Sequence, residues 1–386
     1  MTPFDSAQGR RILLSCGEAS GDLYAGALVD ALRRRDPGVS VFGLGSDRFV
    51  AAGGERIADF HGLSVTGLTE ALRVIPRSLR TINQLVAAAA ERKPHVAVMI
   101  DYPDFNFRLM ARLQRLGIPV VYYISPQLWA WRAGRIRHMK RGAARVLPIF
   151  PFEEAIYRQH QVPVTFVGHP LIDLATPTAT RDALLARLHL DPAKPVVALL
   201  PGSRTNELER IAPVMAQAVP LILAKAPDAQ FVVARAPNLH DHLFEPFGIP
   251  GAAVRIVDGQ ADDVLHASDV VVTASGTATV QTALHGKPMV VLYKLSPMTY
   301  RLGRRLALVD MYAMVNLIAG RRIVVELIQD DCTPEAVAAE TLHILLDGEY
   351  RSMMVSAIND VKAKLGGSGA SDRAAAAILE VARTNG

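Results

Sequence analysis

Two carboxylates follow an apolar run in the first third of the chain, at a place where a proton acceptor could be positioned. The run His95–Ile100 leads directly into Asp101, and Asp104 lies three residues further on. If the run is a strand of an open α/β sheet, Asp101 stands at its carboxyl end, the usual position of catalytic groups in such sheets. A partly desolvated carboxylate there can accept a proton from a hydroxyl group. Asp104 is predicted instead to be the N-cap of a helix over 105–116, so Asp101 is the better candidate base.

A cation and a group of small hydroxyl residues follow two apolar runs in the second half of the chain. Val196–Leu200 ends in a Pro-Gly-Ser turn before Arg204, whose guanidinium offers several donors and keeps its charge, as diphosphate binding requires. Val270–Thr273 leads into a segment whose backbone N–H groups and hydroxyls, at the start of a helix, could bind phosphate. The candidate phosphate ligands are Ser275, Gly276, Thr277 and Thr279. The competing interpretations are a salt bridge from Arg204 to Glu207 or Glu209, and Ser275 as an ordinary N-cap.

A glycine-containing loop follows the first apolar run, Arg11–Cys16. The loop reads Gly17, Glu18, Ala19, Ser20, Gly21 and Asp22. Glycines let a backbone approach a ligand at a helix N-terminus, where N–H groups favour an anion. The alternative is a tight strand-to-helix turn capped by Ser20 or Asp22, with the helix beginning near Leu23. The loop lacks the dinucleotide-binding glycine spacing. Because the second half holds better phosphate candidates, we expect this loop to face an acceptor molecule near Asp101.

Both tryptophans of the chain, Trp129 and Trp131, follow a further apolar run, Val120–Ile124, shortly after Ser125. Aromatic faces near a cleft can pack against sugar rings or acyl chains, and core packing between domains is an equally good interpretation. A basic stretch over 132–145 follows, which suits either an exposed helix face or a surface for phosphate headgroups.

A segment over 65–85 places leucines and isoleucines near helical spacing beside three arginines, and Pro76 interrupts the pattern. This composition suits a broken amphipathic segment on an anionic membrane, although a helix facing the core is the commoner case. Residues 300–308 form a second candidate of the same kind.

The apolar runs that carry these groups are continuous, and each is followed by a longer helical pattern. Strands buried on both faces and separated by helices indicate a parallel sheet of an α/β fold. The strands predicted in the first half are Arg11–Cys16, Val39–Leu44, His95–Asp101, Val120–Ser125, Arg145–Ile149 and Val164–Val167. Those predicted in the second half are Val196–Leu200, Phe231–Ala234, Val254–Val257, Val270–Thr273 and Met289–Tyr293.

The repetition of this pattern predicts two Rossmann-like domains that face one another across a cleft, which also fits a length of 386 residues. A polar, Pro/Thr-rich stretch over 173–180 is the expected linker, so the domains are predicted to span 1–172 and 173–366. From about Pro334 the chain is predicted to be helical. After a glycine-rich break, the last helix, within 367–386, is expected to pack back on the first domain.

The composition excludes a disordered chain, since 50% of the residues are hydrophobic and 20% are charged. The formal charge of +5 slightly favours anionic partners, but no nucleic-acid-binding pattern accompanies it. Cys16 and Cys332 match no zinc or redox spacing and are expected to be buried in a reducing compartment. The first ten residues lack the apolar region of a signal peptide, and no long stretch is free of charge. We therefore expect a cytoplasmic protein that does not span a membrane.

Eight blocks of the sequence, taken together, resemble bacterial lipid-A-disaccharide synthase. They are Gly17–Asp22, Ile100–Asn106, Ser125–Trp131, Pro148–Glu153, Val167–Pro170, Leu200–Arg204, Ser275–Thr279 and Asn316–Arg321. The blocks keep their order and spacing over nearly the whole chain, and together they are far more specific than any one loop. The resemblance implies a GT-B fold and an inverting glycosyltransferase that uses no metal or other cofactor.

The resemblance also implies the substrates and the roles of individual residues. The donor would be UDP-2,3-diacylglucosamine and the acceptor 2,3-diacylglucosamine 1-phosphate (lipid X), joined into a β-1,6 disaccharide on the way to the lipid A of Gram-negative lipopolysaccharide. Asp101 would be the base, Arg204 and Ser275–Thr277 would bind the diphosphate in the second domain, and Asn316 would lie on the acceptor side. The first domain would hold the acceptor. The enzyme would associate peripherally with the anionic inner-membrane surface, without nucleic acid, and a homodimer stays open.

Two positions depart from the family pattern: Gln281 stands where Glu is usual after the Ser-Gly-Thr motif, and Gln127 where a small hydroxyl residue is usual. A carboxylate can accept from both ribose hydroxyls, whereas an amide accepts at one atom only, so UDP binding is expected to weaken by on the order of 1 kcal/mol. The alternatives are an enzyme like UDP-GlcNAc epimerase, which shares the UDP-binding half, and a non-catalytic nucleotide-sugar-binding protein.

Overall fold

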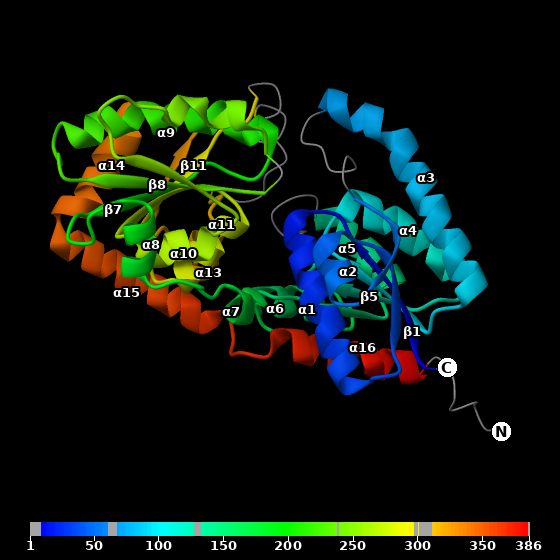
Figure 1. Cartoon of the computed structure of the whole chain (residues 1–386). Coiled ribbons are helices and arrows are strands. Elements are labelled where there is room, and N and C mark those ends of the chain that lie inside the picture. The colour runs from blue at the N-terminus through cyan, green and yellow to red at the C-terminus, as the bar shows by residue number, and fades with distance from the viewer. Residues whose placement is uncertain are drawn as a thin grey trace, which may run out of the picture. The chain divides into compact units, whose positions relative to one another are not determined.

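The computed structural model describes residues 9–60, 68–126, 133–237, 239–296, 300 and 311–384, and for 68–74 and 133 it describes the backbone alone. The chain divides into two compact units. Unit 1 contains the described residues up to Pro170 together with those from Leu365 onward, and unit 2 contains those from Leu171 to Lys364. Each unit is built around one sheet (Figure 1).

The sheet of unit 1 has six strands, all parallel, in the order β3-β2-β1-β4-β5-β6. The strands are β1 (Arg11–Cys16), β2 (Ser40–Leu44), β3 (Glu55–Ala58), β4 (Val96–Ile100), β5 (Val120–Tyr123) and β6 (Arg145–Leu147). Chain order reverses between β1 and β4, where Cys16 pairs with Ile100. The four residues 12–15 and the whole of β4 are buried, which explains their continuous apolar or small side chains.

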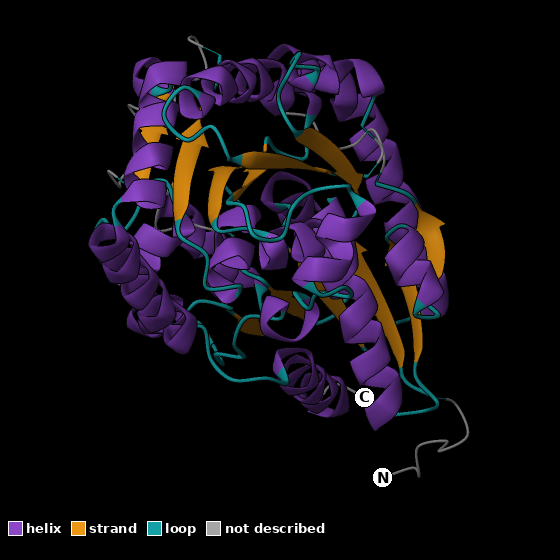
Figure 2. Ribbon diagram, turned by 60° about the vertical axis from the view of Figure 1, so that its left-hand side comes forward, coloured by secondary structure: helices purple, strands orange, loops and turns teal. Residues whose placement is uncertain are grey.

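Helices cover both faces of the strands (Figure 2). In unit 1 they are α1 (Ala19–Arg35), α2 (Asp47–Ala51), α3 (Leu68–Arg92), α4 (Pro103–Arg115), α5 (Ile136–Gly142), α6 (Pro151–Gln159) and α16 (Ala370–Thr384), with a short 3₁₀ turn over Ala133–Arg135. The C-terminal helix α16 packs against α1, where Arg34 and Asp372 form an ion pair of 3.2 Å.

The sheet of unit 2 is also parallel and six-stranded, in the order β12-β11-β10-β7-β8-β9. The strands are β7 (Val196–Leu200), β8 (Gln230–Arg235), β9 (Val254–Asp258), β10 (Val270–Ala274), β11 (Met289–Tyr293) and β12 (Val325–Ile328). Read from the other edge, this is the strand order of unit 1, with the reversal between β7 and β10.

The helices of unit 2 alternate with these strands. They are α7 (Leu171–Leu174), α8 (Arg181–Arg187), α9 (Thr205–Leu223), α10 (Ala261–Ala267), α11 (Thr277–Leu284), α13 (Met314–Ala319), α14 (Pro334–Leu346) and α15 (Gly348–Lys364), with 3₁₀ turns over Asp241–Phe247 and Gln329–Asp331. Among the described residues, no helix combines the length and the apolar character needed to cross a bilayer.

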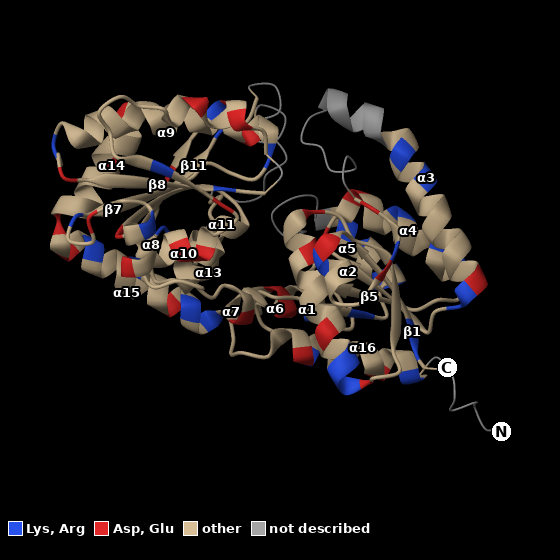
Figure 3. Cartoon of the chain, in the orientation of Figure 1, with Lys and Arg blue, Asp and Glu red and all other residues tan. Residues whose placement is uncertain are grey.

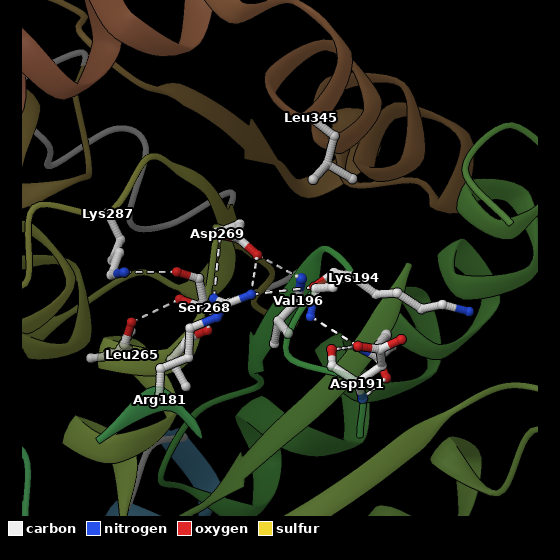
Figure 4. Close-up of polar contacts among 12 residues, drawn as sticks. Arg181, Asp191, Lys194, Val196, Leu265, Ser268, Asp269, Lys287 and Leu345 are labelled. Carbon is white, nitrogen blue, oxygen red and sulfur yellow. Dashed lines mark hydrogen bonds and ion pairs between the residues drawn. The ribbon is translucent and has the colours of Figure 1, made fainter. Parts of the chain in front are cut away.

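The amino ends of the two central strands of unit 2 are tied together by polar contacts (Figure 4). Asp269, just before β10, accepts hydrogen bonds from the Val196 amide of β7 at 2.8 Å and from Arg181 Nη2 at 3.0 Å. Lys287 Nζ donates to the Ser268 carbonyl at 2.7 Å, and burial lowers the pKa of this lysine. The network fixes β7 and β10 at one end, so the loops at their other end start from a rigid base.

The predicted fold class, two Rossmann-like α/β halves, is confirmed, and so is the burial of both cysteines. Every predicted strand except Val164–Val167 is present, whereas β3 and β12 were not predicted. Val164 forms only an isolated bridge with Val146. Helix α1 begins at Ala19, before the predicted start near Leu23, and Pro76 lies inside α3 instead of interrupting it.

Candidate active site

In each sheet the strand order reverses between two strands, and four of the segments singled out in the sequence directly follow these strands. In unit 1, β1 leads into Gly17 and β4 into Asp101; in unit 2, β7 leads into the turn before Arg204 and β10 into Ser275. In open α/β sheets ligands bind beyond the carboxyl ends of the strands at such a reversal. Each unit therefore has polar groups from these segments at the edge where such sheets bind ligands.

The backbone at Asp101 is strained. Asp101 and Tyr102 both have positive φ, 45° and 49°, and so does Ile124 at the end of the neighbouring strand, with 57°. The left-handed region disfavours residues other than glycine, and above all β-branched ones. The Asp101 amide donates to the carbonyl of Ile124 at 3.2 Å, which links the two turns. Strain of this kind persists only where the surrounding structure holds it, and it is frequent at functional sites.

The two candidate bases, Asp101 and Asp104, lie in different environments. The N-cap of α4 is Tyr102, so the prediction that Asp104 caps this helix is wrong; Pro103 begins the helix and Asp104 lies in its first turn. The Asp104 side chain is 74% exposed and its Oδ1 lies 2.5 Å from Arg135 Nη2. Asp101 instead follows a fully buried strand and is itself half-buried, so it is better shielded from water than Asp104.

The glycine-containing loop packs beside this turn. A Cβ at the buried Gly17 would lie 2.1 Å from the ring of Tyr102, so only glycine fits. Glu18 is the N-cap of α1 but makes no side-chain capping bond, and Ser20 and Gly21 lie in the first turn of the helix. Burial, followed by the charge of Glu18, raises the pKa of Tyr102 to about 12. The loop and the Asp101 turn therefore form one continuous edge.

Asp22 has a different role from the one predicted. Its buried carboxylate accepts hydrogen bonds from the amides of Ser46 at 2.6 Å, Arg48 at 2.9 Å and Phe49 at 3.3 Å. It therefore caps the N-terminus of α2, where a negative charge is favoured. The interpretation that Ser20 or Asp22 caps α1 is wrong, because Glu18 occupies the N-cap position.

Ser125 is buried near the end of β5 and donates a hydrogen bond to Glu153 Oε1 at 3.2 Å. Glu153 is also buried and accepts the amide of Phe150 at 3.3 Å, so it joins the start of α6 to this segment. The predicted Trp129 and Trp131 lie outside the described residues, as does Gln127.

In unit 2, Arg204 is the N-cap residue of α9. Its side chain is 40% exposed and Nη1 lies 3.9 Å from Glu207 Oε1, so the competing salt bridge exists but is long. A Cβ on Gly202, whose φ is 123°, would lie 2.7 Å from the Glu207 carboxylate. Tyr293, at the end of β11, interacts electrostatically with both Arg204 and Glu207. Burial, followed by the charge of Glu207, raises the pKa of Tyr293 to about 12, whereas the charge of Arg204 lowers it.

The Ser-Gly-Thr segment contains two hydroxyl groups that bond to the backbone, from the half-buried Ser275 and the buried Thr279, and two exposed residues. Ser275 Oγ donates to the Tyr312 carbonyl at 3.0 Å, and the buried Thr279 donates to the Gly276 carbonyl at 2.8 Å. The N-cap of α11 is Gly276, with φ 141° and open space where a Cβ would stand, so the interpretation of Ser275 as the N-cap is wrong. Gly276 and Thr277 are exposed, so the start of α11 is accessible to a phosphate.

Gln281 lies one turn further along α11. Its Nε2 donates to Asp262 Oδ1 at 2.8 Å, and His285 Nε2 lies 2.8 Å from the same oxygen. Asp262, in the first turn of α10, was not predicted as a site residue; no sequence signal distinguishes it from the adjacent Asp263. A carboxylate is therefore present beside the amide of Gln281.

Asn316 lies in unit 2 and is fully buried. Its Nδ2 donates to the Val324 carbonyl at 3.0 Å and to Glu326 Oε1 at 2.8 Å, and its Oδ1 accepts the amide of Ile323 at 2.8 Å. These bonds tie α13 to the start of β12. The structure therefore gives Asn316 anchoring contacts inside unit 2, and its expected position on the acceptor side stays a prediction.

Solved structures with the same architecture include nucleotide-sugar enzymes. UDP-GlcNAc 2-epimerase from Neisseria meningitidis, bound to UDP-GlcNAc, has a TM-score of 0.69 at 14% identity and covers 96% of this chain and 100% of its own. The calicheamicin glycosyltransferase CalG4 has a TM-score of 0.63 at 17% identity, covering 97% and 99%. Two Rossmann-like units with binding loops at both strand reversals define the GT-B architecture, and the relatives below make this chain a glycosyltransferase.

Sequence comparison identifies the family. The family model for lipid-A-disaccharide synthetase matches residues 12–380. Lipid-A-disaccharide synthase of Myxococcus xanthus is 43% identical over 372 residues, which is 96% of this chain and 97% of the relative. The Geobacter sulfurreducens relative of the same name is 41% identical over 375 residues, covering 96% and 97%. The chain belongs to the lipid-A-disaccharide synthetase family, and its function is that of a glycosyltransferase in lipid A biosynthesis.

Proposed function

We propose that the enzyme transfers 2,3-diacylglucosamine from its UDP derivative to the 6-hydroxyl of 2,3-diacylglucosamine 1-phosphate, with inversion at the anomeric carbon. The observation that supports this most directly is the chemistry at the two strand reversals. Unit 1 has the carboxylate of Asp101 there, and unit 2 has the cation of Arg204 and the exposed N-terminus of α11. A base and a diphosphate site are the two parts that an inverting transfer from a nucleotide sugar needs.

On the donor side, Arg204, Gly276 and Thr277 would contact the diphosphate. A half-exposed guanidinium can form two parallel hydrogen bonds with phosphate oxygens, and the amides at the start of a helix add further donors. Ser275 and Thr279 would act indirectly, because their hydroxyls hold the loop. Gln281 and Asp262 would lie at the ribose.

On the acceptor side, Asp101 would take the proton of the 6-hydroxyl as the bond from that oxygen to the anomeric carbon forms. The bond from the anomeric carbon to the β-phosphate oxygen breaks at the same time, and UDP leaves with the electron pair. Attack from the face opposite the leaving group inverts the anomeric centre, as in inverting glycosidases where the base activates water. Arg204 and the α11 N-terminus would stabilise the charge that develops on UDP.

Acylated substrates require access to a membrane surface, and α3 has suitable side chains. Leu79 is 37% exposed, and Arg77 and Arg80 beside it are exposed as well. Basic positions along this helix are visible in Figure 3. An amphipathic helix with arginines on its polar face suits peripheral binding to anionic lipid, here at the cytoplasmic face of the inner membrane. Sedimentation with vesicles that contain or lack anionic lipid tests this, and equal binding to both would contradict it. The second candidate, 300–308, lies outside the described residues, apart from Tyr300.

The decisive experiment supplies both acylated sugars and follows UDP release together with the mass of the lipid product. Asp101→Asn should lower kcat by about 10²- to 10⁴-fold, the usual contribution of a general base. Asp104→Asn is the matched control, because it makes the same change three residues away at an exposed carboxylate paired with Arg135. It should stay within a few-fold of the parent enzyme.

Absence of UDP release with both acylated substrates would refute the proposed reaction. Epimerisation of non-acylated UDP-GlcNAc without formation of a disaccharide would support the epimerase alternative instead. If Asp104→Asn lost as much turnover as Asp101→Asn, the assignment of the base would be wrong while the reaction itself would stand.

A further inference from the structure

The strained turn at Asp101 is held by hydrogen bonds to its carbonyl oxygen. Tyr122 donates its hydroxyl to this oxygen at 2.7 Å, and Asn106 donates Nδ2 to it, also at 2.7 Å. A carbonyl oxygen has two lone pairs, so these donors use both. The two donors come from different elements, Tyr122 from β5 and Asn106 from α4.

The amide of Asn106 is oriented by a third residue. The buried Ser15, from β1, donates its hydroxyl to Asn106 Oδ1 at 2.7 Å. Nδ2 faces the carbonyls of Asp101 and, at 3.3 Å, of Ile100, which can only accept, so Oδ1 is the atom that accepts from Ser15. Asn106 and Ser15 are both fully buried. Burial also raises the pKa of the Tyr122 phenol well above its usual value, so the hydroxyl stays protonated and remains a donor.

We propose that Tyr122 and Asn106, with Ser15 behind them, are positioning residues that hold the carboxylate of Asp101 in place for proton transfer. The inference rests on the proposed function, since it assumes that Asp101 is the base. The left-handed conformation at Asp101 and Tyr102 is unfavourable for both residues, so the turn relaxes when its carbonyl is released. Relaxation rotates the Asp101 side chain away from the acceptor hydroxyl and leaves unit 2 unchanged.

Tyr122→Phe is the sharpest test, because it deletes one hydroxyl and keeps the buried ring. The expected result is a kcat lower by about 10-fold or more, since small misplacements of a reacting group cost up to 10²-fold. The donor KM and the UDP affinity should change less than about twofold, because the UDP ligands lie in unit 2. The melting curve of the variant gives the fraction of folded protein at the assay temperature, so that kcat is expressed per folded molecule.

Tyr350→Phe is the matched control. Tyr350, in α15 of unit 2, also donates its hydroxyl at 2.7 Å, to Glu340, so the variant loses a comparable hydrogen bond in the unit that does not contain Asp101. A role confined to stability predicts that both variants lower the melting temperature and neither lowers kcat per folded site. The positioning role predicts loss of kcat in Tyr122→Phe alone.

Ser15→Ala provides a second variant should Tyr122→Phe fold poorly. It leaves both donors in place but releases the orientation of Asn106, so a smaller loss of kcat is expected, again without a change in UDP affinity. Full kcat per folded site in both variants, while Asp101→Asn is inactive, would overturn the positioning role and leave the base assignment intact. Full kcat in Asp101→Asn would instead remove the base assignment on which the inference rests.

Discussion

Replacement of Gln281 by glutamate restores the residue usual in the family but should destabilise this protein. Gln281 Nε2 donates to Asp262 Oδ1 at 2.8 Å, so the substitution replaces a donor with a second carboxylate oxygen. Two unit charges about 4 Å apart repel by about 1 kcal/mol in water and about 4 kcal/mol at an effective dielectric constant of 20. The Asp262 side chain is 25% exposed, which places the pair between these limits, at about 2 kcal/mol.

A loss of about 2 kcal/mol lowers the melting temperature by roughly 4 to 8 °C for a unit of this size. The pH dependence provides a second signature. Repulsion raises the pKa of the new carboxyl in the folded state above its value in the unfolded chain, so the penalty is present above that raised pKa and is relieved as the pH falls through it. Melting curves at pH 7.5 and pH 5, measured relative to the parent protein, should therefore converge at the lower pH.

The double variant Asp262→Asn/Gln281→Glu separates repulsion from other effects. The new asparagine amide can donate to the new carboxylate at position 281, so stability at pH 7.5 should recover. A carboxylate at this position can accept from both ribose hydroxyls, so the double variant should bind UDP up to about fivefold more tightly than the parent, a gain of about 1 kcal/mol. This reasoning would be refuted if the single Gln281→Glu variant had the melting temperature of the parent at pH 7.5 and bound UDP more tightly.

Three further outcomes are expected, two for residues of the site and one for the buried His169. Arg204→Lys keeps the charge but loses the planar pair of donors, so calorimetry should show UDP affinity reduced by about 10-fold. Gly17→Ala forces a Cβ to within 2.1 Å of the Tyr102 ring and should lower kcat, whereas Gly134→Ala, which meets no atom within 4 Å, should leave kinetics unchanged. Burial lowers the pKa of His169 from 6.5 to about 3, so the unfolded chain takes up a proton below pH 6.5 that the folded chain does not. Stability should fall as the pH drops from 6.5 toward 3, and melting curves of His169→Asn should show a shallower decline.

The central strands were predictable because a strand that is buried on both faces has a continuous run of apolar residues. β7 reads Val-Val-Ala-Leu-Leu, and all five residues are buried. The edge strands β3 and β12 carry charged residues and lie half-exposed or exposed over most of their length, so their composition resembles that of a loop. Val164–Val167 has the composition of a strand, but it forms only an isolated bridge, between Val164 and Val146. Whether a segment pairs as a strand depends on the segment next to it in the fold, which its own composition does not indicate.

The same distinction applies to the candidate site. The positions of Asp101, Arg204 and Ser275 could be predicted from the strand order alone. A residue just after a central parallel strand lies at the carboxyl edge of the sheet, however the helices pack against it. The contacts of Asp22 and Asn316 depend on lateral packing: Asp22 caps a helix that begins 25 residues later, at Asp47, and Asn316 accepts the amides of residues 323 and 324. Partners of this kind cannot be inferred from spacing along the chain. The catalytic and binding roles themselves stay predictions until the variants above are measured.

Equivalent positions of the two sheets carry opposite chemistry. The loops after β1 and β4 bring the carboxylates of Glu18 and Asp101 to the edge of unit 1, whereas the loops after β7 and β10 bring Arg204 and the amides of α11 to that of unit 2. In the proposed reaction a diphosphate would be repelled by the first edge and attracted by the second, while a hydroxyl that must lose its proton needs a carboxylate. The shared strand order therefore supplies two similar scaffolds. In the proposed reaction, the side chains at the four strand ends would decide which scaffold holds the leaving group and which activates the nucleophile.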